Sequence, residues 1–258
     1  MMGKKLLHRR YVATLLSVGI IFMVWQILAM VINSPLILPL PRETLEVLMQ
    51  DIGKPLFWQH VGATVCRSLA AFGIAVVLGT LLGAAAGAQE IFRNLLDFPL
   101  AILRATPVVS FILLALFWFG TSLVPVFVAV VMSLPVMISS IETGIKNTNK
   151  ELIACCRVYG FSRGKMLRHL YFPSCKPYFF SGSLAVFGLS WKVVAAAEVI
   201  SLPHRSAGTL LQSAKVHLET AQVFAITLVL VILSFVLERF FSFVLRKRGL
   251  LTGGKAAK

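Results

Sequence analysis

The 258-residue sequence is 58% hydrophobic and 14% charged, whereas a soluble domain is about 45–50% apolar and about 25% charged. Its formal net charge of +15 comes from basic residues that gather at 4–10, 146–176 and 239–258, beside apolar runs. This is the distribution of a membrane protein with basic cytoplasmic loops rather than of a nucleic-acid-binding protein. The composition therefore excludes an ordinary soluble domain and indicates a chain that folds in lipid.

Several apolar runs are long enough to cross a bilayer as helices, which takes about 20 residues each. They predict an all-α membrane protein with one transmembrane domain (1–258) and about six spans. The predicted spans are 11–32, 63–88, 98–119, 124–141, 178–200 and 222–243. The basic segments 1–10, 142–177 and 244–258 are expected in the cytoplasm, so both termini are cytoplasmic. The first run carries no charge and exceeds the apolar core of a signal peptide, so we expect it to be retained.

A short helix is predicted between the first two spans. Pro41 is expected to start a short helix that Gly53 and Pro55 end. Its apolar residues share one face, so the helix is expected to lie on the membrane surface. These residues are Leu45, Leu48, Met49 and Ile52.

The second predicted span carries Gly79, Gly83 and Gly87 at intervals of four. Such a stripe lets another helix backbone approach closely. The spacing leaves open whether that helix belongs to the same chain or to a second copy. In the next two spans, Pro107 and Pro135 predict kinks or breaks.

The basic central segment is expected to form two short helices. The first, 151–159, ends at Gly160, which is expected to adopt the left-handed conformation of a helix cap. Ser162 is expected to cap the second helix. Pro173 and Pro177 are expected to stop that helix and to start the fifth span.

This segment carries a recognisable pattern. The stretch 154–160 (Ala-Cys-Cys-Arg-Val-Tyr-Gly), followed by Leu170, Phe172 and Pro173, resembles the EAA loop of ATP-binding-cassette (ABC) importer permeases. That loop reads Glu-Ala-Ala, three residues, Gly, nine residues, Ile-x-Leu-Pro. The stretches 103–107, 118–120, 190–191 and 197–198 also resemble spans of the nitrate/sulfonate/taurine-type permeases. The resemblance covers roughly residues 35–243.

The resemblance implies a type I importer permease fold in which this loop docks on a separate cytoplasmic ATPase. The residues that it implies for coupling are Glu151, Ala154, Cys155, Cys156, Arg157, Tyr159, Gly160 and Pro173. Ala154 stands where the family has glutamate, which leaves the effect on any family ion pair open. Glu151 lies one turn earlier and can present a carboxylate from the same face.

The resemblance also implies partners and a location. ATP and Mg²⁺ are expected on the ATPase, and no cofactor, metal or catalytic residue is expected in this chain, which is not itself an enzyme. A second permease chain, forming a homodimer, an extracytoplasmic solute-binding protein and membrane lipid are the expected partners in the cell inner membrane. The expected substrate is a small anion such as a sulfonate, taurine or nitrate. The alternatives are a vitamin or its precursor, or a secondary transporter or channel that works without an ATPase.

Ionisable side chains inside predicted spans are costly and usually face a bundle interior or a water-filled path. Arg104, Lys192 and Glu198 are such residues. We predict that they line a substrate path, with the neighbouring Trp191 as one wall. The alternative for Lys192 is an ion pair with a carboxylate or a position near the membrane interface.

Overall fold

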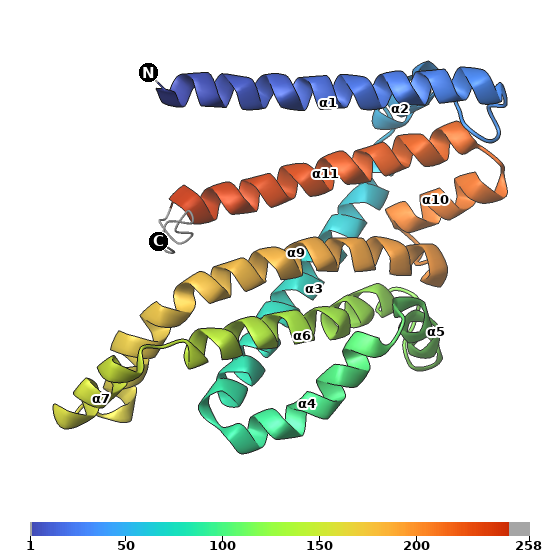
Figure 1. Ribbon diagram of the computed structural model, residues 1–258. Coiled ribbons are helices and arrows are strands. Elements are labelled where there is room, and N and C mark those ends of the chain that lie inside the picture. Colours follow the sequence, from blue (N-terminus) through green and yellow to red (C-terminus); the bar gives the residue numbers. More distant parts are fainter. Residues whose placement is uncertain (1, 248–258) are drawn as a thin grey trace. The chain divides into compact units, whose positions relative to one another are not determined.

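The computed structural model describes residues 2–247, and this part of the chain contains helices and no strand (Figure 1). The prediction of an all-α fold is therefore confirmed, whereas most of the predicted tail 244–258 lies outside the described residues. The elements are α1 (Met2–Ile32), α2 (Pro41–Ile52), α3 (Pro55–Ala88), α4 (Glu90–Ala105), α5 (Val108–Trp118), α6 (Val124–Lys146), α7 (Lys150–Val158), α8 (Arg163–Met166), the π-helix η1 (Leu167–Tyr171), α9 (Phe172–Ser201), α10 (Ala207–Val216) and α11 (Thr220–Lys247).

Four of these helical stretches are long and apolar enough to cross a membrane. They are Pro55–Ala88, Val124–Lys146, Gly164–Ser201 and Thr220–Val244. The pair α4 and α5 makes a fifth if it counts as one span, and Leu16–Ile32 of α1 is a shorter apolar helix. The described residues thus give four or five spans where the sequence predicted about six, and the orientation of the termini stays a prediction.

The predicted third span, 98–119, is not one straight helix. The chain bends by 104° between α4 and α5. Pro107 disfavours helical geometry at the residue before it, and Thr106 is accordingly extended, with φ −79° and ψ 130°. The proline predicted from the sequence to kink this segment therefore breaks it.

The predicted stop at Pro173 is wrong. The helix runs on from Gly164 to Ser201, and the five residues before Phe172 form the π-helix η1, in which the Phe172 N–H bonds to Leu167 O. Proline lacks the N–H that an α-helix needs. The wider turn comes immediately before Pro173, so the helix continues through the proline instead of ending there.

The chain forms two compact units. One comprises the residues up to Gln59 together with Leu210–Leu230. Within it, α2 begins at Pro41 and ends before Gly53, as predicted. Its Leu48 is buried, whereas Leu45, Met49 and Ile52 are exposed.

Polar contacts hold the elements of this first unit together. Trp25 Nε1 donates to Pro39 O at 3.0 Å, and the indole stacks on Phe224. Asp51 accepts hydrogen bonds from Lys54 and Gln222. The exposed apolar side chains on α2 remain available to a membrane surface.

The second unit comprises His60–Thr209 and the residues from Val231 onward. In its core, α6 packs closely against α9, and small residues line the contact. A Cβ atom on Gly182 would lie 2.7 Å from Ser140 Cβ, and one on Gly144 would lie 3.0 Å from Tyr178 Cβ. Ser133 and Ser190 share a hydrogen bond of 3.1 Å across the same contact.

The glycine stripe of α3 lies against α6 of the same chain. A Cβ atom on Gly79 would meet Met137 Cβ at 2.5 Å, and one on Gly87 would meet Ile145 Cδ1 at 2.8 Å. At Gly83 the nearest atom is the backbone oxygen of Ile138, at 2.8 Å. Each distance is too short for a real side chain, so the two backbones approach this closely only because the residues are glycines.

We expect Gly83→Ala to destabilise the chain by about 1–3 kcal/mol, the usual cost of overpacking. The new methyl group meets backbone that cannot rotate away. Gly73→Ala, also in α3, is the matched control because a Cβ there has nothing within 4 Å. Alanine is the better helix former, so this control should be neutral or stabilising by up to about 1 kcal/mol. Thermal unfolding of the purified variants in detergent measures both, and equal midpoints would contradict the packing role of the stripe.

Candidate functional site

The helix α7 is terminated by well-formed caps at both ends. Asn149 Oδ1 accepts a hydrogen bond from Glu151 N at 2.8 Å, as an N-cap does. At the other end, Gly160 has φ +68°, and its N–H bonds to Arg157 O while Phe161 N bonds to Cys156 O. This is a Schellman motif, so the predicted left-handed cap at Gly160 is confirmed, and the helix keeps its ends without help from a partner.

Exposed apolar side chains lie on α7 and at the residue that directly follows it. Val158 is 86% exposed and Tyr159 76% exposed, and Leu152 is exposed as well. An exposed apolar cluster on a connecting segment is typical of a surface that binds another protein. The predicted coupling residues lie here: Glu151, Ala154, Cys155, Arg157, Tyr159 and Gly160 are exposed and Cys156 is half-buried. Pro173 is exposed in the first turn of α9.

Ala154 stands where the family has glutamate, but α7 still carries the carboxylate of Glu151. Ala154 and Glu151 are one turn apart on α7. No ion pair among the described residues includes Glu151. Its carboxylate is therefore not committed to a partner in the described part of the chain.

The predicted path residues fall into two groups. Arg104 and Lys192 are exposed, and neither takes part in an ion pair within residues 2–247. Arg104 lines a pocket of about 490 Å³ between α4, α5, α6 and α9. Trp191 is only 4% exposed and Glu198 is 0% exposed, so both are packed inside the unit.

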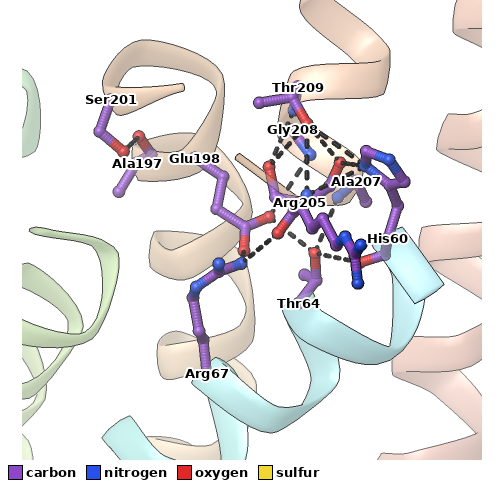
Figure 2. Close-up of polar contacts among 11 residues, drawn as sticks. His60, Thr64, Arg67, Ala197, Glu198, Ser201, Arg205, Ala207, Gly208 and Thr209 are labelled. Atoms are coloured by element: carbon purple, nitrogen blue, oxygen red, sulfur yellow. Dashed lines mark hydrogen bonds and ion pairs between the residues drawn. The ribbon is translucent and has the colours of Figure 1, made fainter. Parts of the chain in front are cut away.

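The carboxylate of Glu198 joins the last turn of α9 to α3 and to the start of α10 (Figure 2). Its Oε1 accepts a hydrogen bond from Arg67 Nη1 at 2.9 Å, and its Oε2 accepts one from Thr64 Oγ1 at 2.7 Å. Gly208 N lies 3.4 Å from Oε2. Burying a carboxylate is costly unless it is paired and hydrogen-bonded. Protein donors occupy both oxygens, which gives Glu198 a structural role here, while its place on a substrate path stays a prediction.

The same network fixes the loop that follows α9. Arg67 Nη1 also donates to Arg205 O at 2.8 Å, and Thr64 Oγ1 accepts from Ala207 N at 2.9 Å. His60 Nδ1 lies 2.9 Å from Ser206 O and 3.1 Å from Ser206 N. Figure 2 shows these contacts converging on α3 from the loop. The loop therefore contributes backbone atoms to these contacts, and α3 contributes side chains.

The N-terminus of α10 is capped by a hydroxyl group and lies beside the Glu198 carboxylate. Ser206 Oγ accepts from Thr209 N at 2.9 Å and so caps the helix. The carboxylate of Glu198 lies beside the positive end of the helix dipole. A Cβ on Gly208 would clash with Glu198 Cβ, so glycine is needed for this approach.

The sequence did not single out Arg67, Thr64, His60 or Gly208. One signal was present: Arg67 is an arginine within the predicted second span, and such a charge needs a partner. Periodicity cannot supply the partner, because Arg67 and Glu198 are 131 residues apart in the chain. Only the packing of α3 against the end of α9 brings them together.

We expect Arg67→Met to lower stability by about 3–5 kcal/mol, because it leaves a buried carboxylate without its counter-charge. The double variant Arg67→Met with Glu198→Gln removes both charges and should recover much of that loss. Arg42→Ala is the control: Arg42 pairs with Glu46 at 2.8 Å but is 87% exposed, and such pairs contribute about 0–1 kcal/mol. Thermal unfolding in detergent ranks the three variants. A single Arg67→Met variant as stable as Arg42→Ala would show that the network does not hold α3 to α9.

The comparisons with known proteins identify the class. The chain belongs to the family described as "Binding-protein-dependent transport system inner membrane component", whose model matches residues 75–249. It is therefore the permease component of an ABC import system and a multi-pass inner-membrane protein. The family predicted from the sequence is confirmed.

Individual relatives agree with this class. The chain is 30% identical to the taurine transport system permease protein TauC of Escherichia coli (strain K12), over 83% of this chain and 80% of TauC. It is 28% identical to the bicarbonate transport system permease protein CmpB of Synechococcus elongatus, over 69% and 67% of the two chains. A solved amino acid ABC transporter with histidines matches 74% of this chain and 92% of its own, with a TM-score of 0.60 and 18% identity. That last similarity shows the fold alone.

Proposed function

We propose that this permease is driven by a separate cytoplasmic ATPase that docks on α7 and that it carries a small anion, such as a sulfonate, taurine or nitrate, across the inner membrane. The observation that carries the docking is the capped helix α7 with its exposed apolar surface around Val158 and Tyr159. ATP and Mg²⁺ bind to the ATPase. An extracytoplasmic binding protein delivers the solute, and a second copy of this chain completes the path.

The coupling follows from a difference in affinity between two states. A partner biases a two-state bundle only when it binds one state more tightly than the other. On binding ATP, the ATPase changes the position of its docking groove and so favours one arrangement of the helices attached to α7. The segment from α7 to η1 leads directly into α9, so the docking surface is continuous with a membrane helix.

The choice of an anion rests on the family relatives and on the charges of the second unit. The taurine and bicarbonate permeases are relatives of this chain. Arg104 and Lys192 are cations in or beside the apolar helices without carboxylate partners among the described residues. The single buried carboxylate of α9, Glu198, is neutralised by Arg67. Together these charges favour an anion over a cation.

The test is affinity purification of the tagged chain from its native membrane, comparing the unmodified chain with Val158→Asp. The new charge would be desolvated at the docking surface, so we expect at least about tenfold weaker association of the ATPase, equivalent to about 1.4 kcal/mol. Val216→Asp, at an exposed apolar residue of α10, is the control and should retain the ATPase. Because Val158 is exposed, the folding of the variant should be unaffected.

Two results would contradict the proposal. Retention of the ATPase by Val158→Asp at the unmodified level would place docking elsewhere. A chain that purifies alone in mild detergent and moves solute without ATP would instead be a secondary transporter or channel. Identification of the co-purifying binding protein would separate a small anion from a vitamin precursor as the cargo.

A further inference from the structure

The bend between α4 and α5 creates a pocket with one cation and no carboxylate. Its volume is about 490 Å³, and α4, α5, α6 and α9 contribute its lining. Arg104 is the only charged residue among the lining residues, and Thr106 and Ser139 add hydroxyl groups. The remaining lining is apolar and includes Met132, Leu189 and Val193. A concave apolar site with a few convergent polar groups is the usual form of a small-molecule binding site.

We propose that this pocket is a substrate-binding station within the permease, and that it takes an organic anion whose charged head group lies on Arg104 and whose apolar body lies against α6 and α9. The inference rests on the proposed anion import and deepens it. The binding protein then does not hold the whole of the selectivity, because the membrane subunit itself discriminates among anions.

Arg104 has donors available for such a head group. Its Nε donates to Leu100 O at 3.2 Å within α4, and its terminal guanidinium nitrogens make no hydrogen bond within the described residues. No acidic side chain pairs with it within the described chain. A guanidinium binds a carboxylate, sulfonate or phosphonate through a planar pair of donors. Lys192 is exposed and lies one helical turn beyond the lining residue Leu189 on α9, so it adds a second positive charge to that helix.

The bend itself explains why the head group belongs at this end of the pocket. Pro107 ends α4 and precedes Val108, the first residue of α5. Arg104 is in the last turn of α4, and Val108 lines the same pocket. The positive end of the α5 dipole therefore lies at the same pocket as the guanidinium, which itself offsets the negative end of α4. An unbroken third span would have placed Arg104 and the α5 terminus on one continuous helix with no such recess.

The size and lining of the pocket favour an organic anion over an inorganic one. A water molecule accounts for about 30 Å³ of liquid volume, and nitrate is of comparable scale, so it fills only a small part of the space. An anion with a short apolar chain places its charge on Arg104 and its carbons on Met132, Leu189 and Val193. Each methylene removed from water should then strengthen binding by about fourfold.

The test uses the purified permease–ATPase complex in detergent, without binding protein, and measures equilibrium binding of radiolabelled 1-butanesulfonate. Unlabelled nitrate, butanoate and sulfonates of increasing chain length serve as competitors. We expect saturable binding, competition by sulfonates that improves with chain length, and weak competition by nitrate. Butanoate separates the head groups: competition equal to that of butanesulfonate indicates recognition of any organic anion, and weaker competition indicates a preference for sulfonates.

The matched variants are Arg104→Gln and Arg93→Gln. Both residues are on α4, but Arg93 pairs with Glu142 at 3.1 Å and does not line the pocket. We expect Arg104→Gln to weaken butanesulfonate binding at least about tenfold, about 1.4 kcal/mol, with Arg104→Lys retaining part of the affinity. Arg93→Gln should bind as the unmodified complex does.

Three outcomes would overturn the inference: no saturable binding, equal binding by Arg104→Gln, or nitrate competing as well as butanesulfonate. The ATPase that co-purifies with each variant reports separately on the proposed function. If Arg104→Gln retains the ATPase but binding is unchanged, the pocket is not the station and the importer proposal stands. If the unmodified chain purifies without an ATPase, the importer proposal itself fails.

Discussion

The close approach of α6 to its neighbours α3 and α9 is the constraint on which the second unit depends. Apolar surface gives no net drive for helices to associate in lipid, so packing at short range must supply it. Gly83 of α3 and Gly182 of α9 let the two helices reach α6, where a Cβ atom would lie 2.8 Å from Ile138 O and 2.7 Å from Ser140 Cβ. With these contacts in place, α6 and α9 form two walls of the Arg104 pocket.

The helix α9 connects the segment that follows α7, the Arg104 pocket and the buried Arg67–Glu198 pair. It continues from the segment that follows α7 without a break between Gly164 and Ser201, and its 30 residues extend about 45 Å. Leu189 and Val193 line the pocket along its length, and Glu198 ties its far end to α3. The π-helix η1 is the irregular point of this rod, and such turns often mark functional sites. One helix therefore leads from the segment that follows α7, along the pocket wall, to the buried ion pair.

Local signals in the sequence predicted local structure well. Pro41 and Gly53 bounded α2, and Gly160 gave the left-handed cap of α7, because turn and cap residues act over a few positions. At Pro107 the sequence could not distinguish a kinked helix from a broken one. At Pro173 it did not predict the π-turn that lets the helix continue. Both outcomes depend on how the surrounding helices pack. The Arg67–Glu198 pair was missed for the same reason: a contact between residues far apart in sequence has no local pattern. Family motifs singled out α7 as the candidate coupling segment, but the pocket became visible only with the bend between α4 and α5.

The docking of the ATPase on α7 is the central claim, and the native thiol of Cys155 tests it most directly. Cys155 is exposed on α7, and the variant Val158→Asp, in which the ATPase should not be retained, serves as the reference. The measurement is the rate of maleimide modification of the Cys155 thiol, resolved by mass spectrometry, in both chains with and without the ATPase. Docking on α7 predicts that the ATPase slows the modification of Cys155 at least about tenfold in the unmodified chain and leaves the rate unchanged in Val158→Asp. Equal rates at Cys155 in the free and the assembled permease would contradict docking on this helix.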